Sequence, residues 1–251
     1  MRLAERYRSI PQSLRKALIE MPVSLIPTSA TRRSRIRDGK RFLRGAGLDR
    51  VERYSQWCST FEPREKAELF TEEFQRTLPI KDEFESFRRW FENANGSGVV
   101  DAAMLTDLMT YLPNDLLVKV DIASMANSLE ARSPFLDHKL IEFAASLPES
   151  IKMRGNETKS LLKKVASRLV PPEVIYRRKM GFGVPIGHWL RGEMKTFLKD
   201  VLLSEKCRNR GVLRPGSVQR YVSEHLEGTH DHSSRLWSLL MLELWFTRFC
   251  D

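Results

Sequence analysis

Residues 111–148 read YLPNDLLVKVDIASMANSLEARSPFLDHKLIEFAASLP, and the spacing of the apolar residues in this stretch decides the fold class. In its last part they recur three or four positions apart, which places them on one face of a helix. These residues are Leu140, Phe143, Ala144 and Leu147. The chain shows no clear run of alternating apolar and polar residues bounded by turn residues, so strands should be few. The sequence therefore predicts a mainly α-helical fold.

Stripes of the same kind lie on both sides of this stretch. They are Ile80, Phe84, Phe87 and Phe91; Leu105, Leu108, Met109 and Leu112; Thr158, Leu161, Leu162, Val165 and Leu169; Met194, Phe197, Leu198 and Val201; and Val218, Tyr221, Val222 and His225. A last helix over residues 234–249 is apolar on nearly every side, which is typical of a helix buried among others. We expect this helix to pass through the core.

Glycine and proline clusters separate the stripes, and the cluster at residues 95–98 (NGSG) is the best candidate for a boundary. It divides a divergent, charged helical region, residues 1–98, from residues 99–251, which are richer in long apolar helices. A chain of 251 residues is long enough for one large domain. We expect the two regions to form one structural unit.

The composition is that of a globular protein without a membrane span. Hydrophobic residues make up 41% and charged residues 29%, and no stretch approaches the roughly 18 uninterrupted apolar residues of a membrane-spanning helix. The first residues carry charges and no apolar core, unlike a signal peptide. The cysteines Cys58, Cys207 and Cys250 form no C-x-x-C pair and are interpreted as ordinary thiols. We predict a cytoplasmic protein with no membrane partner.

The motif EARSPFLD, residues 130–137, predicts a helix corner. Pro134 fixes its own φ and moves Ser133 out of the α region, so a helix carrying Glu130 and Arg132 should end there. These two side chains are expected to form a buried ion pair or a cap. Asp137 suits the N-cap of the next helix. The motif is interpreted as chiefly structural.

Residues 111–148 resemble the C-terminal helical part of the synthetase domain of B-type, glutamine-hydrolysing asparagine synthetases. The resemblance continues through GNETKSLLKKVASRLVPPEVIYRRKMGFGVPIGHWLRGEM (residues 155–194) and RLWSLLMLELWF (residues 235–246). It is dense over residues 100–250 and loose over residues 1–99. It implies the helical half of a pyrophosphate-loop ATPase domain, of the adenine nucleotide alpha hydrolase type, without the parallel sheet.

Enzymes of this type use ATP and Mg²⁺ to activate aspartate as aspartyl-AMP, and ammonia released from glutamine then displaces AMP. The segment RRKMGFGVP, residues 177–185, combines cations with glycines, as a lid over phosphates requires. The resemblance implies that Lys179 is catalytic and stabilises charge near the α-phosphate. It places Lys159 near the pyrophosphate as an ATP-binding residue.

Three features of the family are missing from this sequence. Residue 2 is Arg2 where the glutaminase domain has its cysteine nucleophile, and neither Ser-Gly-Gly-x-Asp-Ser nor Ser-Gly-x-Gly-x-Asp-Glu occurs. Ile122 also stands where relatives commonly carry arginine. We therefore expect a truncated or split synthetase that is inactive alone and binds ATP and Mg²⁺ weakly. Its uncovered apolar helix faces should bind the missing N-terminal half or another copy of the chain.

Other interpretations remain open. A non-catalytic remnant and a subunit of a related amide-forming ligase keep the same fold. A basic helical nucleic-acid-binding protein is suggested by the net charge of +10 and by RRSRIRDGKRFLR, residues 32–44, but only one aromatic residue interrupts these cations. We interpret that segment as a solvated linker. The sequence His230-Asp231-His232 is interpreted as a turn and helix start, because no third metal ligand accompanies it. No metal site is predicted.

Overall fold

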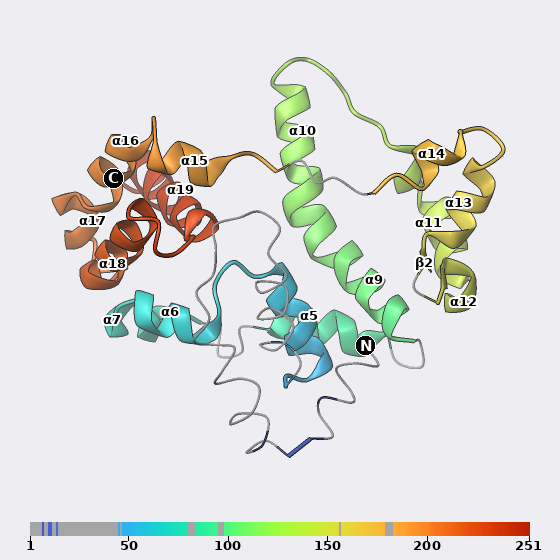
Figure 1. The fold of residues 1–251 in the computed structure, drawn as a ribbon, viewed down its shortest axis with the longest axis horizontal. Helices are drawn as coiled ribbons and strands as arrows, with labels where there is room; N and C mark the ends of the chain where they lie inside the picture. Colours follow the sequence, from blue (N-terminus) through green and yellow to red (C-terminus); the bar gives the residue numbers. More distant parts are fainter. Residues whose placement is uncertain are drawn as a thin grey trace. The chain divides into compact units, whose positions relative to one another are not determined.

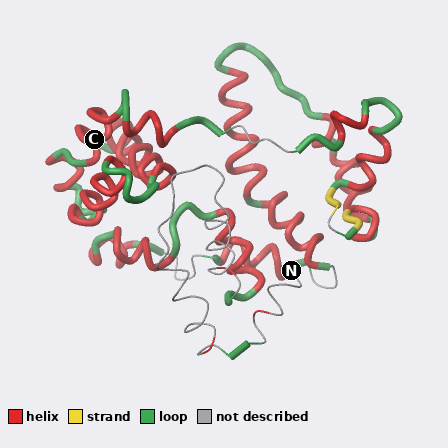
Figure 2. Tube along the Cα trace, viewed as in Figure 1, coloured by secondary structure: helices red, strands yellow, loops and turns green. Residues whose placement is uncertain are grey.

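The structure is a computed structural model that describes most of the chain after residue 46. The described residues are 7, 10, 11, 14, 45, 47–79, 84–94, 98–155, 157–178 and 183–251. Within them the chain is mainly helical (Figure 2), which confirms the predicted fold class. It divides into two compact units, one made of Met1–Glu83 with Gly183–Asp251 and the other of Phe84–Phe182. The boundary predicted at residues 95–98 stays a prediction, since residues 95–97 lie outside the described ranges.

The first unit combines short helices from two distant parts of the sequence (Figure 1). They are α5 (Arg50–Cys58), α6 (Pro63–Leu69), α7 (Glu72–Thr77), α15 (Ile186–Arg191), α16 (Lys195–Leu202), α17 (Glu205–Asn209), α18 (Pro215–Leu226) and α19 (Ser233–Phe249). Side-chain oxygens of Asp49, Thr71 and Ser204 accept backbone N–H groups at the starts of α5, α7 and α17. These caps satisfy donors that have no partner within the helix.

The core of this unit is built from the stripes on α16, α18 and α19. All four residues of the predicted α18 stripe are buried, as are Leu198 and Leu202 on α16. On α19, only one face is buried, and Trp245 and Phe249 on the remaining surface are exposed. The expectation that this helix is enclosed on all sides is therefore wrong, because α15, α16 and α18 pack along one side of it.

The end of α6 pairs with residues 213–214, a segment that lies more than 140 residues later in the sequence. The backbone N–H of Arg214 donates to the carbonyl of Leu69 at 2.8 Å, and Phe70 and Leu213 form an isolated antiparallel bridge. The Leu69 side chain is fully buried in the core cluster. Segments far apart in sequence thus share one core.

A buried ion pair joins α17 to α19. The guanidinium of Arg210 contacts both carboxylate oxygens of Glu243, with the shortest distance of 2.8 Å from Nη2 to Oε1. It also bonds both oxygens of the Asp251 side chain at 2.8 Å and lies 4.6 Å from the centroid of the Phe246 ring. The Glu243 side chain is only 4% exposed, so the guanidinium of Arg210 compensates for the water that this buried carboxylate has lost. Arg210 holds the pKa of the Asp251 carboxyl well below its usual range.

The second unit is also helical, with one small hairpin. Its elements are α8 (Glu85–Asn93), α9 (Val99–Met109), the π-helix η2 (Leu112–Leu117), α10 (Val118–Met125), the 3₁₀-helix η3 (Pro134–Leu136), α11 (His138–Ser146), α12 (Glu149–Lys152), β1 (Met153–Arg154), β2 (Glu157–Thr158), α13 (Ser160–Ala166) and α14 (Pro172–Ile175). The strands β1 and β2 are antiparallel, with Met153 opposite Thr158. They form the only sheet within the described residues, in line with the expectation of few strands.

The start of α9 is capped from a distant part of the unit. The Oε1 atom of Glu149 accepts the backbone N–H groups of Val100 and Asp101 at 2.8 and 3.1 Å. The Nζ atom of Lys152 lies 2.7 Å from Oδ1 of Asp101, and both side chains are mostly buried. A carboxylate at a helix N-terminus also interacts favourably with the helix dipole. These contacts tie α12 to α9.

Changing Gly98 to alanine should remove this cap. The backbone at Gly98 has φ −69°, which alanine adopts freely, but a Cβ atom there would overlap the Glu149 carboxylate. We expect a loss of about 1–2 kcal/mol in the free energy of unfolding, the scale of losing a helix N-terminal cap. Urea unfolding followed by circular dichroism measures it.

The control is the same change in a Glu149→Ala background. If Gly98→Ala acts through the carboxylate, it should cost little there. An equal cost in both backgrounds would contradict the explanation.

Candidate functional site

The predicted phosphate lid lies at the edge of what the structure describes. Lys179 and Gly181 are outside the described residues, so the role assigned to them stays a prediction. The preceding cations Arg177 and Arg178 are exposed and follow the end of α14. The chain is described again from Gly183.

Lys159 lies between the hairpin and a helix. It directly follows β2 and is the N-cap of α13, with φ 59° and ψ 33°. This left-handed conformation is uncommon for a residue with a Cβ atom. It turns the chain sharply from the strand into the helix, where the Lys159 carbonyl accepts the N–H of Lys163 at 2.9 Å.

The lysine side chains beside this turn differ in their partners. Lys163 is paired with Glu157 at 3.1 Å, and its ammonium lies 5.3 Å from the centroid of the Tyr176 ring. Lys159 is exposed, and its ammonium has no ion-pair partner among the described residues. The charge of Lys159 is therefore available to an anionic ligand.

The EARSPFLD segment differs from its predicted structure in two respects: no helix carries Glu130 and Arg132, and their ion pair is not buried. The helix α10 already ends at Met125, and Ser128 turns the chain with φ 57°. Glu130 and Arg132 therefore lie in irregular chain, and their ion pair of 2.7 Å is exposed. The expected burial of this pair is wrong, because the turn precedes the motif.

The second half of the motif follows the prediction. Pro134 opens the short helix η3, and Oδ1 of Asp137 accepts the backbone N–H of Leu140 at 3.0 Å. Asp137 is thus the N-cap of α11, which confirms that part of the interpretation.

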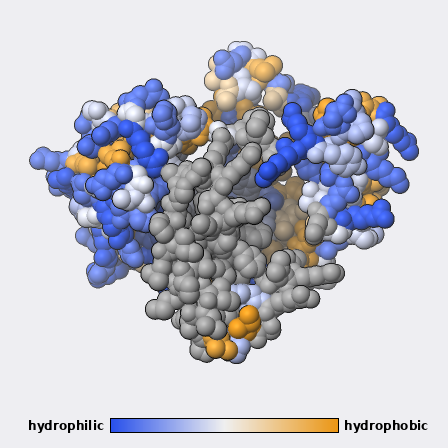
Figure 3. Space-filling model, viewed as in Figure 1, coloured by the Kyte–Doolittle hydropathy of each residue, from blue (hydrophilic) through white to orange (hydrophobic). Residues whose placement is uncertain are grey.

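Apolar side chains are exposed around this corner. Ile122 on α10, Leu129 after it and Phe135 on η3 are all exposed. Figure 3 shows hydrophobic residues around the end of α10 and the loop that follows. On α11, Phe143 of the predicted stripe is 59% exposed. The helices of the second unit therefore carry apolar faces that remain at the surface.

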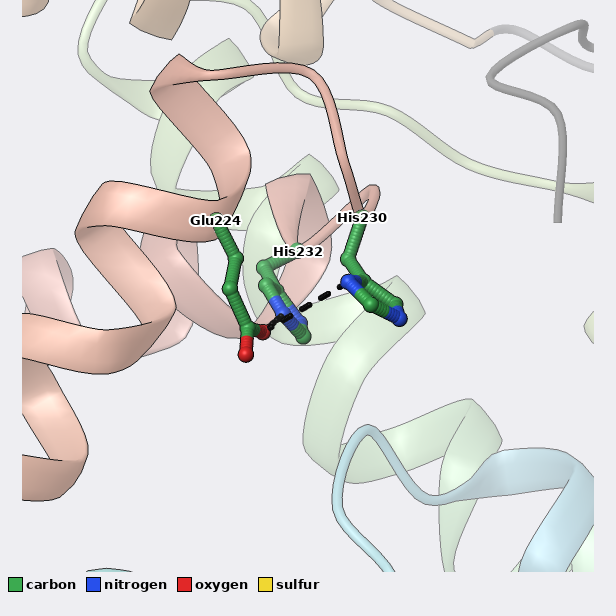
Figure 4. Close-up of side chains that lie close together, drawn as sticks. All are labelled: Glu224, His230 and His232. Atoms are coloured by element: carbon green, nitrogen blue, oxygen red, sulfur yellow. Dashed lines mark hydrogen bonds and ion pairs between the residues drawn. The ribbon is translucent and has the colours of Figure 1, made fainter. Parts of the chain in front are cut away.

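A cluster that the sequence did not predict lies at the end of α18 (Figure 4). Nε2 of His232 is 2.6 Å from Oε2 of Glu224, and Nδ1 of His230 is 3.8 Å from the same oxygen. The chain turns at residues 227–230, slightly before the predicted position, and α19 begins at Ser233 as expected. The third member, Glu224, belongs to the preceding helix, and no local sequence motif links it to the two histidines.

Cys207 shows no feature of an activated nucleophile. Cys207 is buried, and burial, followed by the negative charge of Glu243, raises the pKa of its thiol to about 11. A thiol with such a pKa stays protonated at neutral pH and is a poor nucleophile. Cys58 and Cys250 are exposed. None of the helices in the described ranges has the length and apolar character needed to cross a membrane.

Comparison with known proteins places these features in a family context. Residues 7–247 match the family described as asparagine synthase. The chain is 28% identical over 239 residues to glutamine-hydrolysing asparagine synthetase 1 of Bacillus subtilis (strain 168), covering 95% of this chain and 36% of that protein. It is 40% identical over 146 residues to the Mycobacterium bovis protein named "Putative asparagine synthetase (glutamine-hydrolysing)", covering 58% of this chain and 22% of that protein.

The chain thus spans about a third or less of the length of these relatives, and the matches lie in their C-terminal parts. No solved structure matches the chain.

Proposed function

The chain belongs to the asparagine synthase family, and on this premise we propose that it is the helical C-terminal part of an asparagine synthetase. In this proposal, aspartate is amidated with ATP through an aspartyl-AMP intermediate. The active assembly includes the part of a synthetase that carries the glutaminase and the pyrophosphate loop. The names of the relatives and the position of the matches in them support this proposal.

The observation that carries the proposal is the exposure of apolar helix faces in the second unit. On α18 in the first unit, all four residues of the predicted stripe are buried, whereas Leu162 and Val165 on α13 and Phe143 on α11 are exposed. Leu169, after α13, is 83% exposed. Large exposed apolar surfaces usually mark contacts with another protein or another part of one.

A parallel sheet is the expected cover for such faces. Parallel sheets are buried on both sides by helices, so a sheet and its helices are incomplete without each other. The family resemblance places a parallel sheet in the synthetase domain, upstream of the segment to which this chain corresponds. The exposed faces of α10, α11 and α13 fit helices that pack against such a sheet.

The described residues also fit one part of the proposed ligand. ATP supplies the adenylyl group, and Mg²⁺ neutralises the charge on its phosphates. The exposed ammonium of Lys159 has no ion-pair partner among the described residues and suits a phosphate oxygen. Lys179 is proposed to act at the α-phosphate. Both assignments rest on their positions in the family motifs.

Reconstitution tests the proposal. The chain is mixed with a separately made fragment of the Bacillus subtilis relative that ends where the match begins, and pyrophosphate release is measured. We expect release that depends on both aspartate and ATP in the mixture, and none from this chain alone. Strong release by the chain alone would contradict the proposal.

The mixture separates two of the alternatives, and a nucleic-acid binding test addresses the third. Formation of a complex without pyrophosphate release would favour a non-catalytic remnant. Release that depends on an acid other than aspartate would favour a related amide-forming ligase. Nucleic-acid binding that weakens steeply with salt would favour the third alternative, whose basic segment at residues 32–44 lies outside the described residues.

A further inference from the structure

We propose that Glu224, His230 and His232 form a binding site for a divalent transition-metal ion of the zinc class. The ligand atoms that these three side chains offer all lie within 4.8 Å of one another. Two imidazoles and one carboxylate are a donor set that zinc and similar ions bind, with further positions left for water. The three residues lie outside the sequence segments assigned to ATP, and the inference does not depend on the proposed function.

The loop between α18 and α19 brings the three residues together. Gly228 ends α18 with φ 77°, a conformation that favours glycine, and its N–H donates to the carbonyl of His225 at 3.2 Å. The backbone N–H of His230 then returns to the carbonyl of Glu224 at 3.2 Å. This turn places two histidines of the loop over a carboxylate of the preceding helix, as Figure 4 shows.

The ring of His232 is held in place before any ion binds. It stacks on the buried Tyr221, with ring centroids 4.6 Å apart, and its backbone N–H donates to Nδ1 of His225 at 3.2 Å. The side chain of His232 is only 12% exposed. Such fixed placement reduces the entropy lost when a ligand binds.

The two nitrogens of the His232 ring have different surroundings. Nε2 lies 2.6 Å from Oε2 of Glu224, so an ion bound between them would replace the proton of that contact. Nδ1 is buried and has no hydrogen-bond partner among the described residues, so a ring proton moved to Nδ1 by metal binding would have no acceptor there. The bonds to the ion must outweigh this cost.

The distances require only a modest adjustment. A tetrahedral ion with bonds of about 2.0–2.1 Å needs donor atoms about 3.4 Å apart. The contact of Glu224 with His232, at 2.6 Å, must lengthen, and that with His230, at 3.8 Å, must shorten. His230 is 58% exposed and its ring stacks on His232 with centroids 5.7 Å apart, so it can move without disturbing the core.

The simpler explanation is that the hydrogen bond between Glu224 and His232 only closes the turn. In that case His230 has no role, because its contact with Glu224 is too long for a hydrogen bond. A metal site, in contrast, needs all three side chains. His230 therefore distinguishes the two explanations.

The experiment measures binding of Zn²⁺ and Co²⁺ to tag-free protein by calorimetry and by absorption. Cys58 and Cys250 are replaced by serine in every protein, so that exposed thiols do not compete. We expect saturable binding of one equivalent, and a cobalt spectrum with d–d bands but no thiolate charge transfer. Zn²⁺ should also raise the melting temperature, because it binds only the folded loop.

The variant His230→Gln should weaken Zn²⁺ binding at least about tenfold, since changes outside the ligand set already cost that much. It should leave the circular-dichroism spectrum unchanged. His188→Gln, which changes an exposed histidine of the same unit, is the matched control and should bind Zn²⁺ like the parent. Equal binding by the parent and His230→Gln, or no binding by the parent, would overturn the proposal.

Discussion

Replacing Lys179 with alanine in the reconstituted mixture should lower the rate of pyrophosphate release by about a hundredfold or more. In the proposed function, the lysine ammonium stabilises negative charge that develops at the α-phosphate during adenylyl transfer. Removing one preorganised stabiliser of a transition state costs on the order of 10²–10³ in turnover. The rate at saturating ATP and aspartate is the quantity to compare, because the stabilised charge belongs to the transition state.

The matched control is Arg178→Ala, which removes a neighbouring exposed cation. It should reduce the rate only slightly if the effect belongs to Lys179 and not to the positive charge of the segment. Equal losses in the two variants would remove the assignment of Lys179. If the mixture made with the unsubstituted chain releases no pyrophosphate, the proposed function itself fails.

Replacing Arg210 with methionine should destabilise the first unit by about 3 kcal/mol. Glu243 is almost fully buried, and its carboxylate would lose the guanidinium that contacts both of its oxygens. Breaking a buried pair by removing one partner typically costs about 3–5 kcal/mol, because an unpaired charge is left inside the protein. The partial exposure of Arg210 favours the lower end of that range.

Chemical unfolding followed by tryptophan fluorescence measures this change. The control Lys206→Ala removes a more exposed ion pair to Asp251 and should cost less than about 1 kcal/mol. The double variant Arg210→Met with Glu243→Leu should recover most of the loss, since it removes both charges. A loss that persists fully in the double variant would mean that packing of the arginine, including its contact with Phe246, dominates.

Sequence periodicity marked the helices α8, α9, α11, α13, α16, α18 and α19, but not what covers them, and Thr158 of one stripe lies in β2. The same kind of stripe marks α18, where Val218 and Val222 are buried, and α11, where Phe143 is exposed. The spacing of apolar residues determines which face of a helix is apolar, whereas burial depends on a partner that can be far away in the sequence. The periodic signal is identical in the two cases.

Polar contacts were predicted only where they are local. Asp137 caps α11 by accepting the backbone N–H of Leu140, three residues away, and the Pro134 motif signals this cap directly. The partners Arg210 and Glu243 are 33 residues apart, and no sequence pattern links them. Glu130 and Arg132 were paired correctly, but their burial depended on a turn at Ser128 that has no glycine to mark it.

The histidine cluster shows what signal was missed. His230 and His232 are close in sequence, whereas the third side chain, Glu224, belongs to the helix before the turn. Gly228 is the residue that marks the end of α18 and the reversal of the chain. A carboxylate four residues before this glycine, at Glu224, was the residue to consider.

The joining of Leu69 to Arg214 has a consequence for the order in which the nascent chain folds. The partner of Phe70 on Arg214 is 144 residues further along, so at about 5–20 residues per second it leaves the ribosome roughly 7–30 s later. The unit Phe84–Phe182 is complete in the meantime and can fold first. During that interval the helices that bury Leu69 have not yet been synthesised, so the apolar side of α6 stays exposed. Chaperones that bind exposed apolar segments can bind α6 in this period.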